Sequence, residues 1–458
     1  MEKSKLKYTV GLAIGVLSLL LALHHLPDFE WRGHRLRKVD MLSEVRKVDM
    51  PIEEIDTVYL PVPQVKPAFV DTCRAGLTCI EDYSDSTLRG MTPFYRALDE
   101  AEAVHRPVRI AYLGDSFIEA DILTADLRAM LQRKYGGRGV GFVGITSQVY
   151  GFRPTVRHSF RNWESHSAMD SIGFDKDKQD LSGHYFIPLA GASVELKGQS
   201  NYAERLDTCA LSSILFYNKG LVTLSATVNR QQTVTETFEP TGHLQQMTVS
   251  GRIGSVKWTV NQADSTVFYG VTMDENEGIV LDNYSLRGTS GLSLRSVPLH
   301  MLQQLNALRP YDLIVLQYGL NVATERGRNY DKYLAGMQTV VQHLKQAFPQ
   351  AGILVVSVGD RNYKTEEGEM KTMLGIKNLV RYQQRLAADC DVAFWNLYEA
   401  MGGEGSMVTL VEADPPMANL DYTHINFRGG KHLAGLLFET LVYGKEQYDR
   451  RRAYEAAP

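Results

Sequence analysis

The sequence predicts an α/β fold in which a parallel sheet is covered by helices on both faces. It also predicts an inserted all-β sandwich module and an N-terminal transmembrane helix. Apolar, strand-length runs alternate with helix-period segments over 87–154 and again over 281–458. Between them, residues 155–280 hold short β-rich runs separated by turn residues. An apolar run over 8–26 has no charged residue and predicts the membrane helix.

Composition excludes several classes of protein. The chain has 458 residues, enough for two or three domains, and its 44% hydrophobic and 22% charged content is that of a globular protein. The net charge is −4, and Lys and Arg form no basic block, so no nucleic-acid partner is expected. No cofactor and no metal are expected, because the cysteines lack a second ligand pair at a matching spacing.

The N-terminal segment is interpreted as a signal anchor over 1–26, preceded by Lys3, Lys5 and Lys7. A cleaved signal peptide is the alternative, although no small-x-small cleavage site follows the run. Residues 27–86, charged and then rich in proline, are predicted to form a stalk and linker. We therefore expect the protein at the periplasmic face of a bacterial inner membrane, held by this helix, or exported if the helix is removed.

The four cysteines are compatible with export. Cys73 and Cys79 lie six residues apart and could close a small disulfide loop in an oxidising compartment. Their pairing stays open at this point. Cys209 and Cys390 lie among apolar residues and are predicted to be buried thiols.

The elements of the α/β part follow one another in a regular order. Before the module, the pattern predicts a helix over 92–104, a strand over 108–114 and a helix over 121–137. After it, strands are predicted over 278–288, 311–319, 351–359 and 392–398, and helices over 294–308, 330–348, 378–390 and 427–445. In parallel sheets of this kind, functional residues lie in loops at the carboxyl ends of the strands.

Ser116 is the candidate nucleophile. Asp115 and Ser116 directly follow the strand over 108–114, where a serine hydroxyl can be exposed beside the backbone N–H groups that begin a helix. Asp421 and His424 lie just before the last helix, and their spacing puts a carboxylate and an imidazole on one turn. Each fragment alone is also common in ordinary turns and helix caps.

Two further loops supply candidate oxyanion donors. Gly319 and Asn321 follow the strand over 311–319, and the Asn amide can donate a hydrogen bond while Gly allows close approach. Gly288 follows the strand over 278–288, and its backbone N–H is a further donor, with Gly291 as the competing candidate. Asp115, Gly291 and Gly319 are further candidates for the cleft.

Taken in order, these motifs resemble the SGNH/GDSL hydrolase superfamily, whose domain is a three-layer, flavodoxin-like fold. The resemblance is carried by GDSFIEAD (114–121), NYSLRG (283–288), YGLN (318–321) and DYTHINFRGG (421–430). It is closer to periplasmic peptidoglycan O-acetylesterases, which also hold a carbohydrate-binding-like β-sandwich module between the first block and the later ones. The chain departs from that pattern at Phe117, where many relatives have a polar residue, and in lacking an acidic residue after Asn321.

The resemblance implies hydrolysis of O-acetyl esters on a carbohydrate such as cell-envelope polysaccharide. It implies Ser116, Asp421 and His424 as the triad, with Ser116, Gly288 and Asn321 forming the oxyanion hole. Two alternatives stay open. The same triad suits a polysaccharide O-acetyltransferase that receives acyl groups from a membrane acyltransferase partner, and a catalytically silent glycan-binding protein is the second.

Aromatic residues of the β-rich region could stack on sugar rings, although packing in the core is the simpler explanation for most of them. They are Trp163, Tyr185, Tyr202, Tyr217 and Trp258.

Overall fold

The computed structural model describes residues 2–25, 29–31, 34–36, 69–84, 90–170 and 172–457, and the chain divides into two units, 1–68 and 69–458. In the first unit, helix α1 (Glu2–His25) precedes strands β1 (Phe29–Trp31) and β2 (His34–Leu36), which pair antiparallel. Most of the predicted stalk over 27–86 lies outside the described residues. Its described end, 69–84, belongs to the second unit.

The predicted transmembrane helix is wrong. No helix in the described part of the chain is both long enough and apolar enough to cross a membrane. The stretch of α1 without a charge or a histidine, 8–23, is shorter than the about 20 apolar residues that a spanning helix needs.

A six-stranded sheet forms the centre of the second unit, in the spatial order β14-β4-β15-β16-β19-β3. The first five strands are parallel, and the short β3 pairs antiparallel with β19 at the edge. Their bounds are β14 (Ile279–Ser285), β4 (Val108–Gly114), β15 (Leu313–Gln317), β16 (Gly352–Val356), β19 (Ala393–Trp395) and β3 (Glu81–Asp82). The predicted parallel α/β sheet is therefore present; β4 has its predicted bounds, and the other four parallel strands are shorter than predicted.

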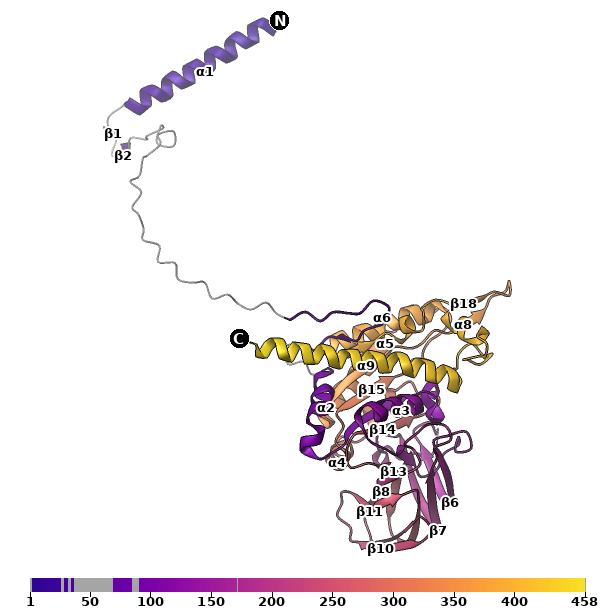
Figure 1. Ribbon diagram of the computed structural model, residues 1–458. Helices are drawn as coiled ribbons and strands as arrows, with labels where there is room; N and C mark the ends of the chain where they lie inside the picture. Colours follow the sequence, from indigo (N-terminus) through magenta and orange to yellow (C-terminus); the bar gives the residue numbers. More distant parts are fainter. Residues whose placement is uncertain are drawn as a thin grey trace. The chain divides into compact units, whose positions relative to one another are not determined.

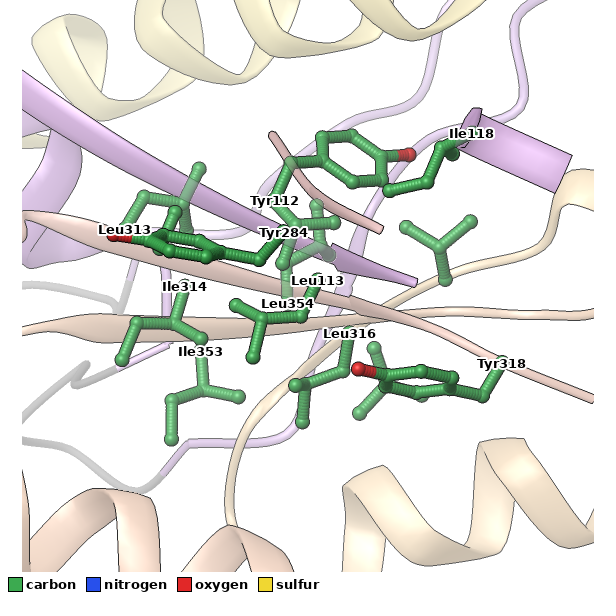
Figure 2. Close-up of a cluster of buried hydrophobic side chains, with 14 of the residues drawn as sticks. Tyr112, Leu113, Ile118, Tyr284, Leu313, Ile314, Leu316, Tyr318, Ile353 and Leu354 are labelled. Atoms are coloured by element: carbon green, nitrogen blue, oxygen red, sulfur yellow. The ribbon is translucent and has the colours of Figure 1, made fainter. Parts of the chain in front are cut away.

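Helices lie on both sides of these strands (Figures 1 and 2). α2 (Thr92–Val104) and α3 (Thr124–Tyr135) pack against α9 (Phe427–Ala456), while α4 (Leu299–Leu308) packs against α5 (Asp331–Ala347), and α5 against α6 (Leu374–Asp389). Short helices fill the connections: η1 (Ser116–Asp121), η2 (Lys176–Lys178), η3 (Leu292–Ser296), α7 (Leu397–Ala400) and α8 (Ser406–Glu412). A hairpin of β17 (Asn362–Lys364) and β18 (Met370–Thr372) follows β16.

The β-rich region forms a nine-stranded antiparallel sheet, seen at the bottom of Figure 1. Its strands are β5 (Gly141–Gly144), β6 (Val156–Ser167), β7 (His184–Gly198), β8 (Cys209–Asn218), β9 (Val222–Val228), β10 (Gln232–Phe238), β11 (Leu244–Ile253), β12 (Ser255–Ala263) and β13 (Thr266–Asp274). We call this sheet with its connections the β-module. It begins with β5, ahead of the boundary at 155 that the sequence suggests, because β5 pairs with β13.

Two hydrophobic cores share the strands of the β-module. Side chains of a strand point alternately to its two faces. Phe268 of β13 accordingly packs in a core within the β-module, together with Trp258, whereas the adjacent Tyr269 packs in the core of the parallel sheet. That second core contains the strand residues Tyr112, Leu316 and Leu354, which are labelled in Figure 2. The β-module is thus packed directly on the α/β part.

A buried charged network lies at the junction between the β-module and the α/β part. Arg309, at the end of α4, pairs with Asp274 of β13 and with Asp282 of β14, and all three side chains are nearly inaccessible to solvent. Tyr311 Oη donates to Asp282 Oδ2 over 2.7 Å, and Phe142 N of β5 donates to Asp282 Oδ1 over the same distance. Strands β5, β13 and β14 and the end of α4 therefore each contribute a residue to one hydrogen-bonded cluster.

Cys73 and Cys79 form a disulfide, the pairing that their spacing suggests. Their loop leads into β3, and Thr78 O in this loop accepts hydrogen bonds from Trp395 Nε1 and Thr440 Oγ1, both at 3.0 Å. The loop is thus attached to the end of the parallel sheet and to α9. Cys209 and Cys390 are free and buried, as predicted.

Candidate active site

The strand order places three of the motif loops side by side. Gly114, the last residue of β4, lies opposite Ser285 of β14 on one side and opposite Gln317 of β15 on the other. All three strands are parallel, so the loops that follow them emerge at the same edge of the sheet. The loop with Ser116 is therefore flanked by the loop that leads to Gly288 and by the loop that leads to Asn321.

Asp115 holds the start of η1, the short helix that begins at Ser116. Its carboxylate accepts a hydrogen bond from Phe117 N over 3.0 Å, which satisfies a backbone donor at the start of the helix. Burial raises the pKa of Asp115 to about 6, against the opposing effects of this hydrogen bond and the charge of His424. Asp115 is only 1% exposed, so in this structure it supports the backbone beneath Ser116.

Ser116, His424 and Asp421 form one continuous chain of hydrogen bonds. Ser116 Oγ lies 3.0 Å from His424 Nε2, and His424 Nδ1 lies 2.8 Å from Asp421 Oδ2. Asp421 Oδ1 also accepts from the backbone N–H groups of Thr423 and His424, both at 3.0 Å. Because a carboxylate accepts at Nδ1, the ring can carry its proton there and present a lone pair at Nε2 to the serine hydroxyl.

The carboxylate of Asp421 is held in its ionised form. Partial burial acts to raise the pKa of Asp421, but the hydrogen bonds from the backbone and ring of His424 and from Thr423 outweigh burial and lower the pKa. Both side chains are accessible, with His424 37% and Asp421 49% exposed. A substrate can therefore reach the ring and the hydroxyl from solvent.

The close approach of α9 brings the His424 turn to the serine loop. Asn426 caps α9 and accepts from Arg428 N and Gly429 N. One turn later, Gly430 packs against the loop between η1 and α3, where a Cβ on Gly430 would overlap the backbone O of Ile122. Gly430 thus lets α9 lie directly on the segment that carries Ser116.

Two candidate oxyanion donors, the Asn321 amide and the Gly288 backbone N–H, lie in different local structures. Asn321 is exposed, and one N–H of its amide donates to Thr289 O over 2.9 Å, which orients the amide and leaves its second N–H. Gly288 has φ +80°, a conformation that favours glycine. Both lie in the loops that flank Ser116.

Gly291 and Gly319 have structural reasons to be glycine. Gly291 N donates to Thr289 Oγ1 over 3.1 Å, and a Cβ on Gly291 would lie 2.7 Å from the Tyr318 ring. Gly319 has φ +139°, and a Cβ there would lie 2.9 Å from Val358. Gly291 has therefore already used the N–H that an oxyanion would need.

Sequence reasoning missed two groups of charged side chains around η1. Glu119 forms an ion pair with Arg287, the neighbour of Gly288. Asp121 is fully buried: burial acts to raise its pKa, but the charges of Arg128 and Arg153 outweigh this and lower the pKa. These partners are distant in sequence, so no local pattern pairs them.

The aromatic residues considered for sugar stacking are mostly committed to packing or hydrogen bonds. Tyr185 and Trp258 are each 1% exposed and lie in the two cores. Trp163 Nε1 donates to Ser193 O, and Tyr202 Oη donates to Asp126 Oδ2. Among the residues that the structure describes, no group of three or more His, Cys, Asp or Glu side chains is arranged to hold a metal ion.

Comparison with solved structures identifies a protein of the same fold. A peptidoglycan O-acetylesterase superposes with a TM-score of 0.67 over 80% of this chain and 99% of its own, at 21% identity. The expected resemblance is therefore confirmed at the level of the fold.

Two other matches superpose too poorly to bear on the fold. A family two carbohydrate esterase from Clostridium thermocellum, in complex with cellohexaose, gives a TM-score of 0.27 at 12% identity, over 62% of this chain and 100% of its own. An acetyl xylan esterase gives a TM-score of 0.27 at 18% identity, over 35% of this chain and 80% of its own. No family model matches the chain, and no curated protein sequence matches it.

Proposed function

We propose that this chain is a serine-dependent esterase that removes O-acetyl groups from a carbohydrate, with peptidoglycan as the first substrate to test. The observation that carries the proposal is the hydrogen-bond chain from Ser116 Oγ through His424 to Asp421. The shared fold with a peptidoglycan O-acetylesterase supports the choice of substrate class. The disulfide of Cys73 and Cys79 supports a place of action in an oxidising compartment such as the periplasm.

The geometry supports a two-step acyl transfer. His424 Nε2 takes the proton of the Ser116 hydroxyl as Oγ attacks the ester carbonyl, while Asp421 holds the ring and stabilises its positive charge. The alcohol leaves with the proton from His424, and acetyl stays on Ser116 Oγ as an ester. A water molecule, deprotonated by His424, then attacks this ester and releases acetate and the free serine.

The oxyanion of each step needs donors beside Ser116. We assign this role to the backbone N–H groups of Ser116 and Gly288 and to the free N–H of the Asn321 amide. The hydrogen bond from Asn321 to Thr289 O keeps the amide in place before substrate arrives, which is the preorganisation that makes such donors effective.

Acetate release from O-acetylated peptidoglycan by the full chain tests the proposal. We expect release by the wild type and a loss of more than about 10⁴-fold in Ser116→Ala, because the variant lacks the hydroxyl that is hydrogen-bonded to His424 Nε2. Ser250→Ala, at an exposed position on β11, is the matched control and should retain full activity.

Labelling with a fluorophosphonate separates the negative outcomes. No release together with labelling of Ser116 would reject this substrate and point to another ester. Appearance of acetyl on an added oligosaccharide, in place of free acetate, would identify a transferase. No labelling at all would reject the nucleophile and with it the proposed function.

A further inference from the structure

A groove beside the candidate site remains without a role. It has a volume of about 290 Å³, at the lower end of the range for small-molecule sites. One wall comes from η1 and the end of β14, with Glu119 and Arg287, and the other comes from the β-module, with Ser165, His166 and His184. The groove therefore lies between the part of the chain that carries Ser116 and the β-module.

The groove lies beside the loop of Gly288, because the preceding residues Leu286 and Arg287 line it. Met169, in the connection after β6, also lines the groove, and its Cε lies 3.4 Å from the position that a Cβ on Gly288 would take. At the same end, Arg287 is held by Glu119, three residues after Ser116. An ester whose carbonyl oxygen faces Gly288 thus has this groove next to it. Because an acetyl group is small, the space suits the alcohol part of the ester.

The charges of the groove are balanced. Glu119 is paired with Arg287, and Arg153 is paired with the buried Asp121. The carboxylate of Asp170 accepts a hydrogen bond from Ser167 N. The formal charges of the lining, Glu119 and Asp170 against Arg153 and Arg287, sum to zero, which favours a neutral, polar ligand. Arg153 Nη2 is buried without a partner among the described residues and is a further donor in this lining.

His166 offers a hydrogen bond that the protein does not use. Its ring is stacked on Tyr185, with centroids 4.5 Å apart and planes 11° from parallel, so that its orientation is fixed. Its Nε2 atom is buried and has no hydrogen-bond partner among the described residues. Buried polar atoms in folded proteins normally have partners, so an unused one in a ligand-sized groove points to a group supplied by the ligand.

Apolar side chains complete the lining. Phe142, Phe186 and Leu286 also line the groove. A pyranose ring has hydroxyl groups at its edge and C–H groups on its faces, which matches unused hydrogen-bonding groups next to apolar surface.

We propose, resting on the esterase function above, that this groove binds a neutral pyranose ring on the alcohol side of the ester. His166 Nε2 hydrogen-bonds one of its hydroxyl groups. The β-module thereby contributes directly to the choice of substrate at Ser116.

The substitution His166→Phe in the full chain tests this proposal, because it keeps a ring that can stack on Tyr185 and removes Nε2. The substrates are p-nitrophenyl acetate and an O-acetylated β-1,4-linked trisaccharide of N-acetylglucosamine. We expect kcat/KM to fall about tenfold on the trisaccharide, the effect of one lost hydrogen bond, and to stay within about twofold on p-nitrophenyl acetate. His243→Phe, at an exposed site outside the groove, is the matched control and should change neither value.

The outcomes separate this proposal from the function on which it rests. Equal losses on both substrates would show a structural role of His166, and no loss on either would show an unused groove; both overturn the proposal while the esterase stands. If neither substrate is cleaved in a Ser116-dependent manner, the proposed function fails. In that case, binding of the unacetylated trisaccharide, measured by titration of the full chain, tests the groove independently of catalysis. Weaker binding by His166→Phe supports it, and unchanged or absent binding overturns it.

Discussion

At the residue scale, three buried aspartates show how their surroundings set the state of a carboxyl group. Asp121 is matched by Arg128 and Arg153 and keeps its charge in the interior. Asp115 and Asp180 have no such cation, and burial raises the pKa of each to about 6. Asp180 Oδ1 accepts from the backbone N–H and hydroxyl of Ser182, while Oδ2 has no partner among the described residues.

Asp180→Asn should therefore change the pH dependence of stability. The pKa of Asp180 in the folded state, about 6, lies above its usual value of 3.8. Its stabilising effect is complete below about pH 4 and is lost as the pH rises through 6, when the buried group must ionise. The free energy of unfolding of Asp180→Asn relative to wild type should rise by up to about 3 kcal/mol between pH 4 and pH 8.

Urea unfolding of both proteins at pH 4 and pH 8 measures this difference. Asp177→Asn, at an exposed position in the same loop, is the control and should show the same difference from wild type at both pH values. A constant difference for Asp180→Asn would contradict the raised pKa.

At the scale of elements, the candidate site depends on the contact between α9 and the segment after η1. Two of the glycines of α9, Gly430 and Gly435, lie in very different surroundings. Gly430 faces the backbone of Ile122, whereas a Cβ on Gly435 would meet nothing within 4 Å. Substitution by alanine at the two positions therefore distinguishes the effect of helix propensity from the effect of a displaced helix.

Gly430→Ala should displace the start of α9 and reduce both stability and activity. Overpacking of this kind costs about 1–3 kcal/mol, and the shift moves His424 away from Ser116 Oγ. Gly435→Ala should instead stabilise the protein by up to about 1 kcal/mol, because alanine favours the helix interior. Thermal unfolding and acetate release measure the two effects. Equal behaviour of both variants would rule out the tight contact at Gly430.

The sequence predicted the elements that are defined by local features, and it missed those that are defined by contacts between residues distant in the sequence. Helix α2 was predicted at its observed bounds because its period and its ends are local features. Parallel strands end at one edge, so the sequence also predicted that the loops with Ser116, Gly288 and Asn321 lie at the same edge of the sheet. The order of the strands, which decides that the last two loops flank Ser116, comes from the structure. Local patterns could not reveal β5, a four-residue strand defined by pairing with β13. Local patterns also missed the last turns of α9, because the many charged residues there obscure the apolar pattern. Tyr448 in these turns nevertheless packs in the core. The apolar run of α1 was wrongly extended to the length of a membrane span.

At the scale of the whole molecule, residues 69–458 form one compact unit. The strands of the β-module contribute side chains to the core of the parallel sheet, as Leu215 and Tyr269 do. The network of Arg309, Asp274 and Asp282 joins the same elements with buried charges. Neither part can be removed without exposing apolar surface of the other.

This unit should unfold in a single calorimetric transition, and Arg309→Met should lower the temperature of that transition. Removing the arginine takes away the ion-pair partner that two buried carboxylates share, which costs about 3–5 kcal/mol. Arg230→Met is the control: Arg230 is 77% exposed in its pair with Glu195, and such pairs contribute about 1 kcal/mol or less. Two separate transitions in the wild type would show that the β-module and the α/β part are independent.

The separation of Ser116 from His424 along the chain, 308 residues, has a consequence for synthesis. The ribosome completes the serine, both strands that flank it and the whole β-module before it reaches the imidazole. A chain that ends between Ser116 and Asp421 carries the hydroxyl without the carboxylate and the imidazole of the proposed triad. Translation through His424 is therefore a condition for activation of the proposed nucleophile, and shorter products lack it.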